Sequence, residues 1–475
     1  MKAQSSHPMR EASRTALSDA TLQQALNNLG RGFVEKRARA AADFDEFEAS
    51  RDHARDIKNH TLAHLDIYLE RYEARVLAAG GHVHWARNDG EARRIILDLC
   101  KAKKTQLVTK SKSMISEEIG LNEALETAGF NVLETDLGEY IIQLRGEQPS
   151  HIIAPAVHVL KHQVEETFRT HHTTLPADRK LDQRSELVRE ARIQLRQQFA
   201  KADIGITGAN FLVADHGAAV IVTNEGNADL TMNCAKTHIV LASIEKMVPS
   251  LNDLSVLLRV LGRSATGQAM TAYTSLVCGP KRSDDEDGPE EFHVILLDHQ
   301  RSQLLGGEFQ DMLRCLRCGA CLNHCPVYQA AGGHAYGSVY PGPMGSVLTP
   351  LISSPAPWRN LAHASTLCGR CEAVCPVRIP LPRMLRALRR IDFERKQAPP
   401  VHRAAITLWS HLARHPRFYG LVNRIAARLM KRIAGKRGAI QSMPGARGWC
   451  SVRDLPAPSG YSFQEWWDQQ QRPRD

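Results

Sequence analysis

The sequence predicts an α/β domain with a parallel sheet, followed by a cysteine-rich region and a basic helical C-terminal region. Short apolar segments alternate with amphipathic segments in the first half of the chain, which is the pattern of a parallel sheet covered by helices. Seven of the eleven cysteines fall between Cys315 and Cys375. The segment from Arg395 to Arg447 contains twelve Lys or Arg and no Asp or Glu.

Four regions follow from these patterns, with boundaries where the pattern changes. They are a helical N-terminal region at 1–69, an α/β domain at 70–304, a cysteine-rich domain at 305–384 and a helical basic domain at 385–475. Around the first boundary a helix is predicted because apolar residues recur on one face before a glycine pair. These residues are Leu65, Tyr68, Leu69, Tyr72 and Val76, followed by Gly80 and Gly81.

Strands and helices alternate within the α/β domain. Strands are expected at 82–87, 106–110 and 131–136, and helices at 91–104, 116–129 and 186–203. Further apolar runs, short enough to be buried strands, lie at 211–215, 218–224, 237–243, 271–277 and 292–298. The acidic loop at 281–291 is predicted to be the solvated tip of a hairpin.

The composition is that of a globular protein, with 43% hydrophobic and 24% charged residues. The net charge of +10 comes from the basic C-terminal segment, since the remainder of the chain sums to about −2. The N-terminus lacks the apolar core of a secretory signal, and no apolar run approaches the length of a membrane span. We therefore expect a cytoplasmic protein, in which paired cysteines favour metal ligation over disulfides.

The cysteines form two related motifs. "CLRCGACLNHCPVY" reads C-x2-C-x2-C-x3-C-P, and "LCGRCEAVCPV" is a shortened second copy with three cysteines. Zinc sites also use C-x-x-C pairs, usually four thiolates in two pairs. Three closely spaced thiolates with a fourth before proline are typical of iron–sulfur clusters in two-cluster ferredoxins, where the fourth cysteine binds the other cluster. The motifs therefore predict two [4Fe-4S] clusters, which form an electron-transfer path. A purely structural role rarely needs two clusters.

The crossed pattern assigns seven ligands. Cluster 1 is expected on Cys315, Cys318, Cys321 and Cys375, and cluster 2 on Cys325, Cys368 and Cys371. The position that would supply the eighth thiolate holds Ser365. Three possibilities stay open for this iron: an open or partner-filled site, the serine oxygen, or a remote cysteine. The remaining thiols are Cys100, Cys234 and Cys278, predicted as buried small hydrophobes, and Cys450, which could fold back from the tail.

Polar residues follow several apolar runs of the α/β domain. "GITGANF" (205–211) offers backbone N–H groups that could bind an anion, although it matches no Walker A or G-x-G-x-x-G pattern. Asn224 and Glu225 would lie at a strand's carboxyl end, where open α/β sheets bind ligands, or they are simple turn residues. His151, His158 and His238 lie beside apolar runs, which favours structural roles over metal ligation. We find no flavin or nicotinamide fingerprint.

The basic segment also has three interpretations. Residues 418–433 predict an amphipathic helix with an apolar face flanked by Arg and Lys. It could contact an anionic membrane surface, dock on an acidic partner, or be a solvated basic face. Nucleic-acid binding is disfavoured because few aromatic residues are placed for stacking.

Taken together, these strings resemble a known family. "KSKSMISEEIGLN", "ETDLGEYIIQL", "PSHIIAPAVH", "GITGANF", "VTNEGN" and "HIVLASIEKMVP" resemble the LUD domain of lactate-utilisation proteins. The ferredoxin-type pair and the closing W-x4-D-x-P…SFQEWW (Trp449 to Trp467) are similar to the lactate-utilisation protein B family. The resemblance covers about residue 60 to the C-terminus, and the family shares the shortened second cysteine motif.

The resemblance implies a fold, a function and partners. The LUD domain would have a NagB/RpiA/CoA-transferase-like α/β fold, next to an α-helical two-cluster ferredoxin domain. The chain would carry electrons in a cytoplasmic complex that oxidises L-lactate to pyruvate. Its partners would be lactate-utilisation protein A, which is cysteine-rich and heterodisulfide-reductase-like, and lactate-utilisation protein C, which is a second LUD protein. The alternatives are another 2-hydroxy acid, such as glycolate, or a LUD-domain small-molecule enzyme or redox sensor.

Overall fold

The computed structural model describes residues 9–353, 358–398, 400–443, 447–450 and 453–471. The chain divides into two compact units, Met1–Arg389 and Arg390–Asp475. Both cysteine motifs and the α/β domain belong to the first unit, and the basic segment belongs to the second.

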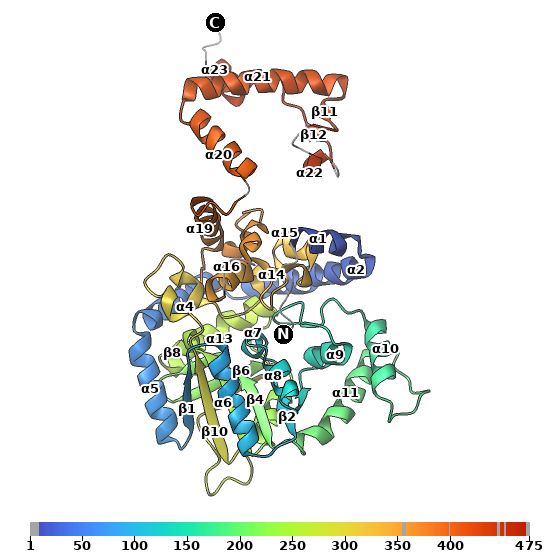
Figure 1. Cartoon of the computed structure of the whole chain (residues 1–475), viewed down its shortest axis with the longest axis vertical. Helices are drawn as coiled ribbons and strands as arrows, with labels where there is room; N and C mark the ends of the chain where they lie inside the picture. The colour runs from blue at the N-terminus through green and yellow to red at the C-terminus, as the bar shows by residue number, and fades with distance from the viewer. Residues whose placement is uncertain (1–8, 354–357, 399, 444–446, 451–452, 472–475) are drawn as a thin grey trace. The chain divides into compact units, whose positions relative to one another are not determined.

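A six-stranded parallel sheet forms the centre of the first unit, in the order β1-β10-β7-β4-β2-β3 (Figure 1). The strands are β1 His82–Ala86, β2 Leu107–Lys110, β3 Asn131–Glu134, β4 Ile204–Gly208, β7 Thr237–Ser243 and β10 Glu291–Leu297. Every residue of β7 is buried, as expected for a strand covered on both faces. The predicted parallel α/β sheet is therefore confirmed.

Helices connect and cover these strands (Figure 1). They are α5 Leu65–Ala78, α6 Asp89–Ala102, α7 Met114–Glu118, α8 Leu121–Thr127, α9 Leu137–Arg145, α10 Lys161–His171, α11 Arg184–Phe199, α12 Asn227–Asn233 and α13 Leu251–Ala265. Several begin at side-chain caps: the Asn88 side chain accepts from the Glu91 amide at 2.9 Å, and Asp136 accepts from the amides of Gly138 and Glu139.

A second sheet of four strands packs against this core. It has the order β8-β5-β6-β9, with β5 Phe211–Val213, β6 Ala218–Thr223, β8 Met247–Val248 and β9 Tyr273–Val277. Strands β5 and β6 pair antiparallel around Gly217, whose φ of 62° suits glycine. The predicted hairpin at 281–291 is wrong, because this exposed loop joins strands of different sheets. Short apolar runs reveal that strands exist but not which sheet they join.

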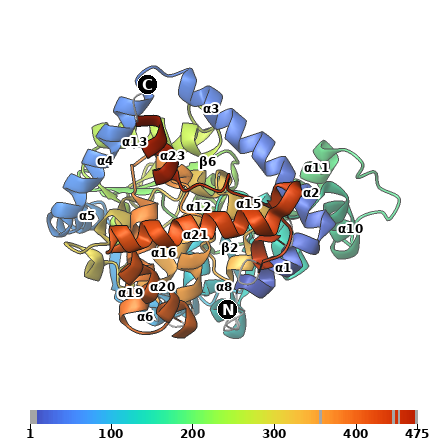
Figure 2. The ribbon, with the colours of Figure 1, turned by 90° about the horizontal axis from the view of Figure 1, so that it is seen from above.

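The N-terminal helices pack on the cysteine region. They are α1 Met9–Ser18, α2 Ala20–Leu29, α3 Glu35–Ala42 and α4 Phe47–Ala63. Helix α2, a π-helical turn at Gly30–Val34 and α3 follow one another without a break before the chain turns into α4 (Figure 2). Helix α1 contacts α15 (Pro326–Ala331), and α4 contacts the turn Gln310–Arg314 just before the first cysteine motif.

The Gly/Pro-rich segment between the two cysteine motifs leads into a buried helix. This helix is α16, Gly342–Ile352, and nearly all of it is buried. Gly345 explains part of the composition, because a Cβ there would lie 1.5 Å from the carbonyl oxygen of Tyr340. The glycine thus permits a close backbone approach inside the cysteine domain.

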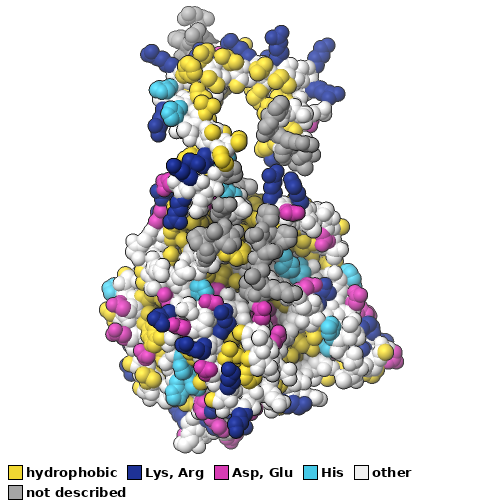
Figure 3. Space-filling view, viewed as in Figure 1, with side chains coloured by type: hydrophobic (Ala, Val, Ile, Leu, Met, Phe, Trp, Pro, Cys, Tyr) yellow, Lys and Arg dark blue, Asp and Glu magenta, His cyan; other side chains and the backbone are white. Residues whose placement is uncertain are grey.

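The second unit is helical and basic. Its helices are α20 Pro400–Ala413, α21 Pro416–Ala434, α22 Arg447–Cys450 and α23 Phe463–Gln471, and β11 Ala439–Ile440 pairs with β12 Leu455–Pro456. Helix α21 confirms the predicted amphipathic helix. Figure 3 shows apolar side chains and Lys or Arg side chains along α20 and α21. The exposed apolar residues of α21 are Phe418, Leu421, Val422, Ile425, Leu429 and Ile433.

Within the described ranges, no helix is both long enough and apolar enough to cross a membrane.

Candidate functional site: two cysteine groups and an α/β cavity

The four cysteines expected on cluster 1 line one small cavity. Cys315, Cys318, Cys321 and Cys375 surround it, and most of the other lining residues are apolar. Burial raises the pKa of Cys318 to about 12, and the neighbouring Cys375 and Cys315 act in the same direction. Four converging thiols in a largely apolar cavity suit a cubane cluster, which uses four thiolates. The same thiols without a metal would be costly to ionise together.

The three cysteines expected on cluster 2 form a separate group. Burial raises the pKa of Cys371 to about 12, and Cys325 raises it further. Burial and Cys368 likewise raise the pKa of Cys325. Cys368 is exposed, and an amide hydrogen bond from Arg370 lowers its pKa. The structure thus brings the last cysteine of each motif to the other motif, as in crossed ligation, while ligation itself stays a prediction.

The two motifs have matching backbones. The residue before the second cysteine position is left-handed in both, with φ of 59° at Arg317 and 56° at Leu367. The glycine after it is also left-handed, with φ of 74° at Gly319 and 81° at Gly369. A four-residue helix follows in each copy, α14 Ala320–Asn323 and α18 Arg370–Ala373. Left-handed conformations at two matched positions, followed by a helix of equal length, show that the shortened motif is a structural repeat.

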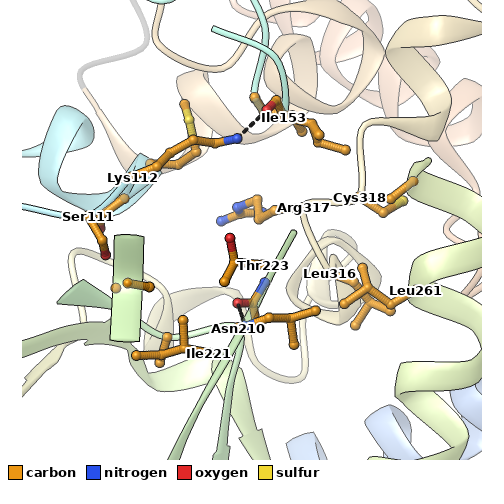
Figure 4. Close-up of a pocket in the computed structure, with 18 of the residues that line it drawn as sticks. Ser111, Lys112, Ile153, Asn210, Ile221, Thr223, Leu261, Leu316, Arg317 and Cys318 are labelled. Atoms are coloured by element: carbon orange, nitrogen blue, oxygen red, sulfur yellow. Dashed lines mark hydrogen bonds between the residues drawn. The ribbon is translucent and has the colours of Figure 1, made fainter. Parts of the chain in front are cut away.

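The α/β domain holds a cavity of about 300 Å³ (Figure 4). Residues that follow β2, β3, β4 and β7 line it, so it lies at the carboxyl edge of the parallel sheet, where such sheets bind ligands. Gly208 and Asn210 of "GITGANF" line it, as do Asn224 and Glu225. The last two follow β6 of the second sheet and not a parallel strand, so both sheets build the cavity.

Comparison with known proteins agrees with these features. The chain matches the family models of the LUD domain at residues 69–297, of the 4Fe-4S dicluster domain at 311–379, and of "Lactate utilisation protein B, C-terminal" at 370–472. "Lactate utilization protein B" of Shouchella clausii is 42% identical over 467 residues, which cover 98% of this chain and 97% of that protein. This chain belongs to the lactate utilisation protein B family.

Other comparisons vary in strength. "Lactate utilization protein B" of Macrococcus caseolyticus is also 42% identical, over 96% of both chains. Among solved structures, a DUF162 family protein from Deinococcus radiodurans covers 49% of this chain and 98% of its own, at 12% identity and a TM-score of 0.27. That likeness is too weak to support an argument.

In this member of the lactate utilisation protein B family, Ser365 takes the structural place of a cysteine. The Arg317 amide donates to Sγ of Cys315 at 3.4 Å, and the matching Leu367 amide donates to Oγ of Ser365 at 3.1 Å. The serine oxygen therefore occupies the position of the sulfur in the first copy. A serine oxygen can bind iron, but it is a harder donor and suits iron less well than thiolate.

The other thiols are distributed differently from the prediction. Cys100 is buried on α6, as expected, but Cys234 and Cys278 are exposed, so the prediction that they are buried is wrong. Both lie at the ends of elements, where the apolar pattern that suggested burial stops. Cys450 lies in the second unit, with its Sγ 3.8 Å from the carbonyl oxygen of Ile440. Cys450 therefore stays a predicted alternative for the fourth ligand of cluster 2.

Substitutions at Ser365 and Cys450 should identify the fourth ligand of cluster 2. If serine binds, Ser365→Ala should convert a four-iron signal of the oxidised protein to a three-iron signal in electron paramagnetic resonance (EPR) spectra. If the iron is open, Ser365→Ala should change nothing, while Ser365→Cys should make the cluster more resistant to oxidation. If Cys450→Ala alone converts the four-iron signal to a three-iron signal, both the serine ligand and the open iron are contradicted, and Cys450 is the fourth ligand.

Two arginines of the N-terminal helices hold the second cysteine motif, and sequence reasoning missed both. The buried Arg51 donates to the carbonyl oxygens of Cys375 at 2.8 Å and Ala373 at 2.6 Å, and Arg37 donates to that of Val374 at 3.1 Å. Because each guanidinium is cationic, the pair also adds positive charge beside the cysteines expected on cluster 1. These residues are marked only by their hydrogen bonds to distant backbone carbonyls, which a single sequence does not reveal.

The three histidines take the predicted structural roles. His151 bonds Oδ1 of Asn323 at 3.0 Å, His158 bonds Glu147 at 2.7 Å, and His238 bonds the Thr207 hydroxyl at 2.8 Å. Burial lowers the pKa of His151 to about 4 and that of His238 to about 3. Both rings are therefore neutral at pH 7 and serve as hydrogen-bonding core residues.

A buried lysine lies among acids beneath the cavity loops. Nζ of Lys110 is 2.7 Å from Glu134 and 3.2 Å from Glu117. Burial alone would lower the pKa of Lys110, but these acids raise it above its ordinary value. Burial raises the pKa of Glu134 to about 7 against the opposing effect of Lys110. Lys110 and Glu134 end β2 and β3, which pair at this register, so the cluster fixes the sheet edge that carries the cavity.

Proposed function

We propose that the chain is the iron–sulfur electron-transfer subunit of a complex that oxidises L-lactate to pyruvate. The observation that carries this proposal is the pair of cysteine groups within a member of the lactate utilisation protein B family. A [4Fe-4S] cluster transfers one electron at a time. Lactate oxidation releases two electrons, so two clusters in one chain suit the reaction.

The partners and finer fold relations belong to the same proposal. In the cytoplasm, the complex would also contain a cysteine-rich, heterodisulfide-reductase-like protein and a second LUD protein. The parallel sheet with ligand loops at its carboxyl edge supports a NagB/RpiA-like relationship for the LUD domain. The short helices around the cysteines support a helical ferredoxin-like domain. Another 2-hydroxy acid, such as glycolate, would use the same electron path.

The α/β cavity favours a second candidate function. A cavity of about 300 Å³ with polar loops is large enough for a small molecule. The chain would then be a small-molecule-binding enzyme or redox sensor. The two functions differ in their need for partners, because a sensor binds its ligand and changes redox state alone.

We expect the purified chain alone not to oxidise L-lactate with an artificial electron acceptor. We find no flavin or nicotinamide fingerprint in the sequence, and iron–sulfur clusters do not take hydride from a hydroxy acid. The measurement compares lactate-to-acceptor electron flow of the purified chain alone with that of the complex from its native host, assayed with and without this chain. Robust turnover by the chain alone would overturn the proposed electron-transfer role.

The basic helix α21 is proposed to contact an anionic membrane surface. Its exposed apolar residues and its many Arg and Lys side chains are the features of an interfacial helix. We expect co-sedimentation with anionic vesicles but not with neutral ones, and loss of binding at high salt. If the chain does not bind anionic vesicles at low salt, the membrane proposal is wrong, and α21 either docks on an acidic partner or is a solvated basic face.

A further inference from the structure

The cavity of the LUD domain and the cavity of the first cysteine group share a wall. Leu316, Arg317 and Cys318 line both of them. Figure 4 shows these three residues together at one side of the larger cavity. Since Cys318 is an expected ligand of cluster 1, a molecule in the LUD cavity would be separated from that cluster by a single loop.

This wall is positively charged. The guanidinium of Arg317 extends from the cysteine loop into the cavity (Figure 4), where it donates to Glu245 at 3.2 Å and lies 4.9 Å from the ring centre of Tyr340. Lys246, which follows β7, lines the same cavity. Within the part of the chain that the structure describes, the Lys246 ammonium makes no hydrogen bond or ion pair.

Two other carboxylates line the cavity, but those of Asp136 and Glu225 accept from backbone amides of the first turn of α9 and are not paired with Lys246 or Arg317. Glu245 also pairs with Arg301 at 3.0 Å, and its carbonyl oxygen accepts from the buried Lys58 at 2.5 Å. Arg301 and Arg317 thus pair with two buried carboxylates, those of Glu245 and Glu118, whereas Lys58 donates only to backbone carbonyl oxygens. The two arginines and two carboxylates balance each other, and Lys246 adds a further basic group. Buried charges are stable when they are paired, so this end of the cavity lacks negative charge. Guanidinium and ammonium groups bind carboxylates and phosphates through strong charge-assisted hydrogen bonds.

We propose that the LUD cavity binds a small organic anion, whose carboxylate or phosphate is held by Lys246 and Arg317, and that binding is coupled to the redox state of cluster 1. The coupling rests on the proposed function, because it requires a cluster on the first cysteine group. A bound anion places negative charge beside the cluster and so disfavours the reduced form, which carries one more electron. By linkage, reduction weakens anion binding by the same factor.

The test uses the anaerobically purified full chain. Binding of L-lactate, pyruvate and inorganic phosphate is measured by calorimetry at constant ionic strength, in the wild type and in Lys246→Gln. The control is Lys236→Gln, which changes an exposed lysine outside the cavity. At least one probe should bind, and Lys246→Gln but not Lys236→Gln should weaken it about tenfold or more. Tighter binding of L-lactate and pyruvate would indicate a carboxylate ligand, and tighter binding of phosphate would indicate a phosphorylated ligand.

The coupling has its own readout. The reduction potential of cluster 1, followed by EPR in a redox titration, should fall when the binding probe is added, by about 59 mV for each tenfold difference in affinity between the oxidised and reduced forms. Absence of binding by all three probes, or equal binding by Lys246→Gln, would overturn the anion site. Binding without a shift in potential would overturn the coupling. A chain without iron would refute the proposed function, while the calorimetric result would still decide the anion site.

Discussion

Replacing Cys375 with alanine should remove about half of the iron from the protein. The wild type, purified anaerobically, should be brown and contain roughly seven to eight irons and no stoichiometric zinc. Cys375 lies with Cys315, Cys318 and Cys321 around one cavity, although it belongs to the other motif. Its loss should therefore release cluster 1 and leave roughly four irons on the second group, as measured by metal analysis and visible absorption.

A double variant distinguishes crossed from uncrossed ligation. If Cys315 and Cys375 bind the same cluster, Cys315→Ala with Cys375→Ala should still retain roughly four irons. If each motif binds its own cluster, the double variant should lose nearly all iron. The control is Cys234→Ala, because Cys234 is exposed and lies outside both groups. Colourless wild-type protein with one or two zinc ions would contradict the electron-transfer function altogether.

Arg301→Met should lower the free energy of unfolding by about 3–5 kcal/mol, because it leaves buried carboxylates without their partner. The Arg301 side chain is fully buried, 2.7 Å from Glu118 and 3.0 Å from Glu245. Glu245 also binds Arg317 at 3.2 Å, and Glu118 accepts from the Tyr340 hydroxyl at 2.6 Å. This network connects the sheet of the LUD domain with the cysteine domain, so its loss should affect both. The measurement is anaerobic denaturant unfolding.

The loss of stability caused by Arg301→Met should depend on pH, because the network contains the carboxylate of Glu245. Burial opposes the ionisation of Glu245, but Arg301 and Arg317 outweigh burial and lower its pKa to about 2 from 4.5. The stabilisation is therefore complete above pH 4.5 and is lost as the pH falls toward 2. The difference between wild type and Arg301→Met should shrink in this window. The matched control is Arg39→Met, whose exposed pair with Glu35 at 3.7 Å should contribute less than about 1 kcal/mol. Equal effects of the two substitutions would contradict the account of this network.

Local sequence patterns predicted much of the candidate site. The spacing of the cysteines predicted which of them would gather, because the motif sets the backbone of a short loop. The same spacing identified Ser365 as the replaced position, and the matched hydrogen bonds of Cys315 and Ser365 agree with this interpretation. The parallel sheet was predictable because its strands alternate with helices in the chain.

Contacts between distant segments could not be predicted in this way. Arg51 binds a carbonyl oxygen 324 residues away, and no local pattern marks that pairing. The separate sheet of β5, β6, β8 and β9 was missed because its strands are short apolar runs like those of the main sheet. The wall of Leu316, Arg317 and Cys318 between the two cavities depends on how two domains pack. These tertiary features decide what lies beside the first cysteine group.

The most direct test of the proposed function is to add L-lactate anaerobically to the complex purified from its native host and to record EPR spectra at low temperature. The account predicts that lactate produces signals of reduced clusters, and that Cys375→Ala in this chain removes the signal of cluster 1. Two results would contradict the account. In one, the complex forms pyruvate while both clusters of this chain stay oxidised; in the other, Cys375→Ala leaves the rate of pyruvate formation and the EPR signals unchanged.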